Sequence, residues 1–133
     1  MAGAGETVEP LSEQQVLAFL HRFDAAQNSE DFDSVAPMLH PDVLFRFNDG
    51  DYRGIESARG AFESTWAHDV EDEVYRLSDI EVLHAGNNWA TATYRFHWSG
   101  VAAGGPFEVG GRGTAVIVLH QGKLKLLVEH LSR

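Results

Sequence analysis

The hydrophobic positions in the first half of the chain recur every three or four residues, which is typical of amphipathic helices. One helix is predicted over residues 12–27, where it opens with the Ser-Glu-Gln-Gln sequence of a capping box. A short second helix is predicted from Ser29, a favourable N-cap, to His40, because the residue before a proline avoids the helical region. A third helix is predicted over residues 55–66, with its apolar side chains on one side.

From residue 74 onwards the pattern changes to the alternation of apolar and polar residues that is typical of strands. The pattern resumes on both sides of a Gln-Gly turn near the C-terminal end, which predicts a closing hairpin. The Asn-Asp-Gly-Asp sequence after the first strand predicts a turn, and residues 100–106 a flexible loop. Strands are therefore predicted over residues 42–47, 74–84, 89–99 and, in the hairpin, 107–132.

Three helices combined with mostly antiparallel strands predict an α+β fold, in which the helices pack on a curved sheet. At 133 residues the chain has the length of one domain and buries enough surface for a substantial core. We interpret residues 1–10 as a flexible N-terminal tail and residues 11–133 as a single domain.

Composition and charge exclude several classes of function. The chain has no cysteine, which excludes disulfides, thiolate metal sites and cysteine nucleophiles and fits a reducing cytoplasm. Its net charge of −10, without a cluster of Lys or Arg, makes nucleic acid and anionic membranes poor partners. Residues 1–10 lack the basic and apolar parts of a signal peptide, and no apolar run is long enough to span a membrane. We therefore predict a cytoplasmic protein.

Several segments together resemble one protein family. The sequences SEDFDSVAPMLHPD and VLFRFNDGDYRG, and above all the closing GRGT…VEHLS, are similar to the SnoaL-like branch of the nuclear transport factor 2-like superfamily, which includes relatives of ketosteroid isomerase. The resemblance extends over residues 11–132. It implies a cone-shaped α+β barrel, open at one end around an apolar pocket, and dimers formed through the outer sheet face. It implies no single activity, because the fold serves isomerases, cyclases, hydrolases, dehydratases and binding modules.

The resemblance also allows the catalytic roles of ketosteroid isomerase to be placed on this sequence. That enzyme uses an aspartate base and an oxyanion hole made by a tyrosine and a protonated aspartic acid. Here the base position is occupied by Phe47, the tyrosine position by Phe23, and the acid position lies near Thr114. None has the required chemistry, so steroid isomerisation by that mechanism is not expected. A one-residue change of register brings Asn48 or Asp49 to the base position and keeps this chemistry open.

His130 is the residue that we predict to act as an acid or base. Uninterrupted alternation along the last strand places it on the same face as the aliphatic residues of that strand, and this face should line the pocket. An ordinary histidine pKa of about 6.5 suits proton transfer at neutral pH. The alternative is a histidine that only supports the core through hydrogen bonds. Candidate partners for it are Asp24, Asp49 and Tyr52.

The opposite face of the predicted sheet carries polar residues. Alternation places Arg95 and His97 there, followed by Arg112 and Glu129 on the closing hairpin. Because residues that face each other on antiparallel strands interact, Arg112 and Glu129 are predicted to form an ion pair. We interpret this face as the homodimer interface that the resemblance implies, with the alternative that it is a second active site.

Aromatic residues supply the walls of the expected pocket, since apolar walls with a few polar edges are the usual make-up of a small-molecule site. The predicted ligand is small and apolar, and the resemblance implies one like a polyketide, a terpenoid or a steroid. The seven histidines show no spacing typical of metal ligands, so neither a metal nor another cofactor is predicted. The predicted ligand-binding residues are Phe23, Phe47, Trp66, Tyr94, Phe96 and Trp98.

Three functions stay open on the sequence alone. The first is a ligand-binding protein that transfers a proton on a carbonyl compound, as an isomerase or cyclase does, with His130 as acid or base. The second is a binding or accessory module without catalysis, for which the missing aspartate and tyrosine argue. The third is a purely structural domain that dimerises and fills the pocket with its own side chains.

Overall fold

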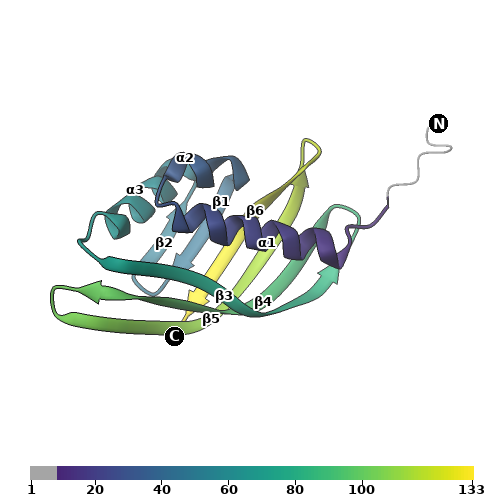
Figure 1. Ribbon diagram of the computed structural model, residues 1–133. Helices are drawn as coiled ribbons and strands as arrows, with labels where there is room; N and C mark the ends of the chain where they lie inside the picture. The colour runs from purple at the N-terminus through teal and green to yellow at the C-terminus, as the bar shows by residue number, and fades with distance from the viewer. Residues whose placement is uncertain (1–8) are drawn as a thin grey trace.

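The computed structural model describes residues 9–133 and places the helices against one face of a single six-stranded sheet (Figure 1). The predicted tail lies outside the described residues except for its last two positions. The sheet has the order β2-β1-β6-β5-β4-β3 and is antiparallel apart from the pair β1 and β6. The elements are α1 (Glu13–Asn28), α2 (Phe32–Val35), the 3-10 helix η1 (Ala36–Met38), β1 (Leu39–Phe47), β2 (Gly50–Arg53), α3 (Ile55–Trp66), β3 (Glu71–Ala85), β4 (Trp89–Ala102), β5 (Gly105–His120) and β6 (Lys123–Ser132).

This arrangement is the predicted cone-shaped α+β barrel, but four local details differ from the prediction. A turn is predicted after the first strand, but residues 50–53 also form the short strand β2, which pairs with β1. The His-Pro sequence at residues 40–41 lies within β1, since β1 already begins at Leu39 beside β6. The cap of α2 is Asp31 rather than Ser29. The predicted loop is a tight turn, because β4 and β5 stay paired almost to their ends.

The core lies between α1, α2, α3 and the inner face of the sheet. The alternation predicted for β4 is confirmed: Tyr94 and Phe96 are buried, whereas Arg95 is exposed. Among residues 9–133, Glu129 is the one charged side chain that is buried with the apolar core. The largest fully buried side chains are Phe19, Phe23, Phe32, Phe45, Leu20, Ile117, Leu126, Glu129, Val16, Val35 and Val43. Within the same residues, no helix is long and apolar enough to cross a membrane.

The C-terminal end of α1 satisfies the free edge of β3. The Asn28 amide pairs with both backbone groups of Tyr75: its Nδ2 donates to the carbonyl oxygen at 2.5 Å, and its Oδ1 accepts from the amide at 2.8 Å. The Asp24 carboxylate accepts a hydrogen bond from the Leu77 amide at 3.2 Å. Because β3 ends the sheet, these side chains replace a neighbouring strand. They also fix the position of Tyr75 relative to the helix.

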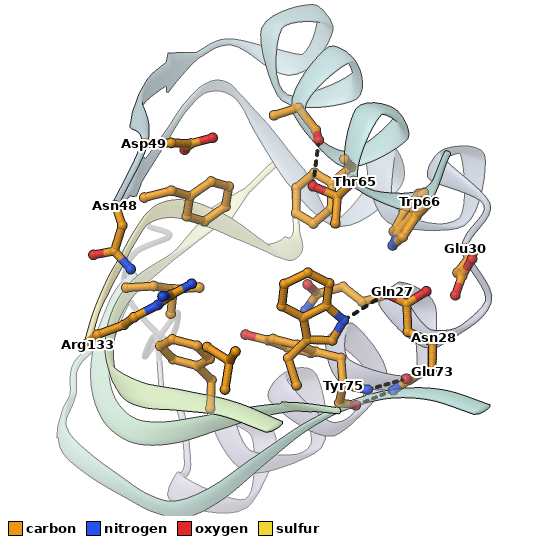
Figure 2. A pocket seen from close by; sticks show the side chains of 17 residues that line it. Gln27, Asn28, Glu30, Asn48, Asp49, Thr65, Trp66, Glu73, Tyr75 and Arg133 are labelled. Atoms are coloured by element: carbon orange, nitrogen blue, oxygen red, sulfur yellow. Dashed lines mark hydrogen bonds between the residues drawn. The ribbon is translucent and has the colours of Figure 1, made fainter. Parts of the chain in front are cut away.

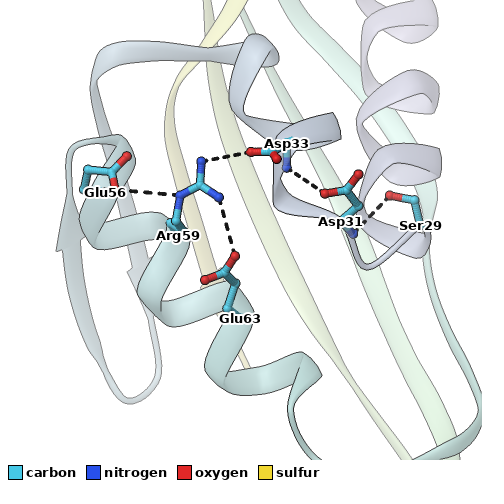
Figure 3. Close-up of polar contacts among 6 residues, drawn as sticks. All are labelled: Ser29, Asp31, Asp33, Glu56, Arg59 and Glu63. Atoms are coloured by element: carbon cyan, nitrogen blue, oxygen red, sulfur yellow. Dashed lines mark hydrogen bonds and ion pairs between the residues drawn. The ribbon is translucent and has the colours of Figure 1, made fainter.

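Arg59 ties α3 to α2 (Figure 3). Its guanidinium lies 4.8 Å from the centre of the Phe32 ring, which belongs to the core. Exposed ion pairs of this kind contribute little one by one, but the contact with Phe32 joins them to a buried side chain. The three ion pairs of Arg59 are with Asp33 at 3.1 Å, Glu63 at 3.5 Å and Glu56 at 3.7 Å. Helix α3 is thereby held in place over β1 and β2.

Candidate functional site

A cavity of about 300 Å³ opens beside the C-terminal ends of α1 and α3, above the inner face of the sheet (Figure 2). Most of its wall is apolar and includes six aromatic side chains, and its polar groups come from several elements that are distant in the sequence. Such a make-up is typical of a small-molecule site. The aromatic lining residues are Phe47, Phe62, Trp66, Tyr75, Phe96 and Trp98; the polar and charged ones are Gln27, Asn28, Glu30, Asn48, Asp49, Thr65, Glu73 and Arg133.

The structure places the predicted ligand-binding residues in two groups. Four of them, Phe47, Trp66, Phe96 and Trp98, line the cavity. Phe23 is fully buried in the core, and Tyr94 is 3% exposed, so neither belongs to the cavity wall. Ligand binding by these residues stays a prediction.

A β-bulge in the last strand decides which of its polar residues faces the core. The pairing between β5 and β6 shifts by one residue at Leu127, which is left without a partner. After Leu127, each residue of β6 therefore points to the side of the sheet opposite to the one that uninterrupted alternation predicts. The Glu129 side chain is 1% exposed, whereas His130 is exposed. The prediction that His130 lies on the apolar face is therefore wrong, and the catalytic role assigned to it loses that support.

The same exchange removes the predicted ion pair between Arg112 and Glu129. Arg112 is exposed on the outer face opposite Arg95 of β4, whereas Glu129 points inward opposite Ala115. The prediction that Glu129 belongs to the outer face is wrong for this reason. His97 lies on the outer face as predicted, half-buried, with its Nε2 at 2.7 Å from the Ser78 hydroxyl.

The residues placed by analogy with ketosteroid isomerase are also dispersed. Thr114 is exposed on the outer face opposite His130, so no acid acts in the pocket from that position. Asn48 and Asp49, the alternative base positions, lie at the rim of the cavity (Figure 2). Asp24 accepts a hydrogen bond at the edge of β3, and the Tyr52 ring packs against Phe47 in a tilted arrangement with ring centres 5.9 Å apart.

Glu129 has the chemistry that was assigned to His130. It lies between Phe45 of β1 and Ala115 of β5, both of which are fully buried. The Tyr94 hydroxyl donates a hydrogen bond to Oε2 at 2.5 Å, and Oε1 has no partner. Burial, opposed by the hydrogen bond from Tyr94, raises the pKa of Glu129 from 4.5 to about 7. A carboxyl with its pKa raised this far can give or accept a proton near neutral pH.

Glycines of β5 make room for the contact between Tyr94 and Glu129. Tyr94 is on β4 and Glu129 on β6, so the ring has to cross the intervening strand β5. It crosses at Gly113, where a Cβ would collide with Tyr94 and with Leu131 of β6. Gly111 leaves space for Phe96 in the same way. The Gly-Arg-Gly sequence thus turns its arginine outward and its two side-chain-free positions toward the aromatic residues.

Glu129 does not line the cavity itself but lies two residues along β6 from a residue that does. Leu131, the next inward residue of β6, lines the cavity, and so does Phe96, the next inward residue after Tyr94. A repeat of two residues along a strand is about 7 Å. Two lining residues have buried polar atoms without a partner, namely the Tyr75 hydroxyl and the Gln27 Nε2. Because such atoms cost about 1–3 kcal/mol when unpartnered, we expect water or a polar ligand atom to bind them.

The sequence contained a signal for Glu129. In KLKLLVEHL the Leu-Leu doublet interrupts the alternation, and such an interruption is typical of a bulge. No local signal marked Tyr75 or Gln27, because their importance depends on the packing of α1 against β3.

Comparison with known proteins agrees with the fold. An NTF2-like superfamily protein from Salmonella enterica superimposes with a TM-score of 0.78 at 19% identity, over 90% of this chain and 88% of that one. An NTF2-like protein of unknown function from Pseudomonas putida superimposes with a TM-score of 0.79 at 16% identity, over 90% of this chain and 84% of that one. Aln2 from a Streptomyces species superimposes with a TM-score of 0.78 at 16% identity, over 94% of both chains. At these identities the likeness shows the fold alone.

Sequence comparison places the chain in a family. No match is found among curated proteins. The model of the SnoaL-like domain family matches residues 20–127, which is most of the chain. This match shows that the chain belongs to the SnoaL-like domain family, and the solved structures show that it has the NTF2-like fold.

Proposed function

We propose that the protein binds a small, mostly apolar molecule with a carbonyl group in this cavity and transfers a proton on it, with Glu129 as the acid or base. The observation that carries the proposal is the state of that residue. Its carboxyl is 1% exposed, one oxygen accepts from Tyr94, and the other has no partner. A buried carboxyl left partly unpartnered costs stability, which favours a role in function over one in folding.

The unpartnered groups suit the steps of a proton transfer next to a carbonyl. The Tyr75 hydroxyl and the Gln27 amide donate to the carbonyl oxygen, where negative charge develops. The free Oε1 of Glu129 lies about one strand repeat below the lining residues, so it accepts the proton from a carbon that reaches past them or through one relaying water. The carboxyl returns the proton to a second carbon, so that a carbon–carbon double bond of the ligand moves and no other reactant is consumed. The aromatic wall holds the hydrocarbon part and limits the access of water.

The test is deuterium exchange into a bound ketone. Steroids, polyketide intermediates, terpenoids and fatty acids are first screened by thermal shift, where a ligand at a hundred times its Kd adds about 2.7 kcal/mol of stability. For ketone hits, exchange at the carbon next to the carbonyl is followed by NMR in deuterated buffer. We expect the rate to rise with pH and to level off above about 7, the pKa of Glu129. The Glu129→Gln variant should bind without exchange, and the exposed control His130→Gln should keep both activities.

A binding module without catalysis is the second candidate. It is favoured by Phe47 and Phe23, which occupy the base and tyrosine positions of ketosteroid isomerase with side chains that transfer no proton. Tight ligand binding without any exchange in the wild-type protein, at any pH, supports this candidate against the first.

We further propose that two copies associate through the outer sheet face. Trp89, Val116 and Val118 form an apolar and partly exposed patch there, and Arg95 and Arg112 lie opposite each other on adjacent strands beside it. Aromatic residues and arginine are enriched at protein interfaces, which supports this choice of face. The cytoplasmic location stays a prediction from the sequence.

A further inference from the structure

The rim of the cavity carries a pair of carboxylates without a basic partner. Glu30 lies in the turn between α1 and α2, and Glu73 lies on β3; both line the cavity. Among residues 9–133 neither forms an ion pair. Burial raises the pKa of Glu30, and the carboxyl of Glu73 raises it further through a hydrogen bond and through its charge. Two acids held this close repel each other, so a cation between them is favourable.

The Glu73 side chain is held by a specific contact, and the backbone of Glu30 has an unusual conformation. The indole Nε1 of Trp98 donates to Oε2 of Glu73 at 2.7 Å, which leaves the second oxygen free. Glu30 has a backbone φ of 54°, a left-handed conformation that is uncommon for residues other than glycine, asparagine and aspartate. A left-handed residue directly after the C-cap commonly ends a helix, and here this conformation fixes the direction in which the chain leaves α1.

Two of the three acidic lining residues lie on the same side of the cavity. Figure 2 shows Glu30 and Glu73 with Trp66 on this side, and Asp49 with Asn48 and Arg133 on the other. Among the described lining residues, Arg133 is the one basic residue. The acidic side therefore combines negative charge with the electron-rich face of an indole, and a positively charged amine is the group that both attract.

A second observation independently indicates that the cavity takes a ligand. Gln27 is 7% exposed, lines the same cavity, and its Nε2 has no hydrogen-bond acceptor. The buried Tyr75 hydroxyl is equally unpartnered. These two buried donors lack an acceptor, whereas Glu30 and Glu73 offer carboxylates, so the two kinds of group are complementary to different polar parts of one molecule.

Building on the proposed function, we infer that the ligand is an amphipathic amine: its ammonium group binds between Glu30, Glu73 and the Trp66 indole, and its carbonyl end points to Tyr75 and Gln27. A bare metal ion is the less suitable occupant. No group of three or more His, Asp or Glu residues in the described part of the chain is placed to hold one, and calcium takes about 6–8 oxygen ligands.

The test compares two probes of nearly equal shape, naphthylmethylamine, which is a cation at neutral pH, and naphthylmethanol, which is not. Binding is measured by calorimetry on the wild-type protein and on Glu30→Gln, Glu73→Gln and the double variant. The matched control is Glu81→Gln, an exposed glutamate of β3 outside the cavity lining. Each substitution keeps the shape of the side chain and removes one charge, so the double variant removes two.

We expect the amine to bind about tenfold more tightly than the alcohol, a preference of about 1.4 kcal/mol, and to lose this advantage in the double variant but not in the control. Equal binding of the two probes, or an equal loss of both in the variants, overturns the inference. If the Glu73 variant disturbs Trp98 and folds poorly, Glu30→Gln alone decides, since Glu30 is exposed in a turn.

The outcome also separates this inference from the proposed function. Binding of the alcohol with Glu129-dependent exchange on a ketone, but without any preference for the amine, overturns the inference and leaves the proposed function standing. Failure of both probes and of the whole ketone panel to bind overturns both.

Discussion

The pH dependence of stability tests the buried state of Glu129 without any knowledge of the ligand. The folded protein holds the Glu129 proton more tightly than the unfolded chain, because burial raises the pKa from 4.5 to about 7. The stability that this residue contributes is fully present below pH 4.5, and it is lost as the pH rises through about 7. Roughly 2.5 units of pKa correspond to about 3 kcal/mol of unfolding free energy.

The substitution Glu129→Gln removes this titration and keeps a group that accepts from Tyr94. We expect the variant and the wild type to differ little near pH 5, and the variant to be the more stable by up to about 3 kcal/mol above pH 8. For a domain of this size that is a difference in Tm of about 10 °C. Urea unfolding over this pH range gives the free energy of unfolding of each protein as a function of pH. Subtracting the two curves removes the part of the pH dependence that the raised pKa of Asp24 contributes to both proteins and leaves the titration of Glu129, including its repulsion by Asp24.

The control is Glu108→Gln, which changes an exposed glutamate of β5 and should leave the curve parallel to that of the wild type. Parallel curves for Glu129→Gln would refute the reasoning, since they would mean that the carboxyl titrates as it does in water. The proposed proton transfer would then lack its acid.

Three further predictions concern the surroundings of this carboxyl and the outer face. Tyr94→Phe removes the hydrogen bond that lowers the pKa of Glu129, so urea unfolding should show a loss of about 1–3 kcal/mol above pH 8 and a smaller loss at pH 5; equal losses would contradict it. Gly113→Ala places a methyl group against Tyr94 and should cost about 1–3 kcal/mol, whereas Gly104→Ala, with no atom within 4 Å of its Cβ, serves as the neutral control. Arg112→Ala should increase the monomer fraction in sedimentation velocity, and an unchanged dimer would argue against the proposed interface.

Local signals in the sequence predicted the helices and most strands well. The capping box at Ser12 is present, with reciprocal hydrogen bonds to Gln15 of 2.7 and 3.0 Å. The third helix has the predicted bounds, and β4 alternates as predicted. Each of these features depends on residues a few positions apart, so propensity and periodicity are sufficient to predict them.

The candidate site was predicted less well, because it depends on contacts between distant segments. The position of Glu129 follows from how β6 pairs with β5, and uninterrupted alternation gives the wrong face. Glu30 and Glu73 meet only because Asn28 and Asp24 bind α1 to the edge of β3. The aromatic residues were easier to predict, since a large apolar side chain on an inward face lines either the core or a cavity.

The extra residue at Leu127 shifts the pattern of inward and outward side chains along the rest of the last strand by one position. Every residue after it changes sides, although no residue type has changed. A relative that is one residue shorter at this point, with the rest of the strand paired in the same way, presents the same carboxylate to its interior. Site residues in this family are therefore best compared by counting back from the end of the strand, because an alignment that ignores the extra residue equates an inward carboxylate with an outward imidazole.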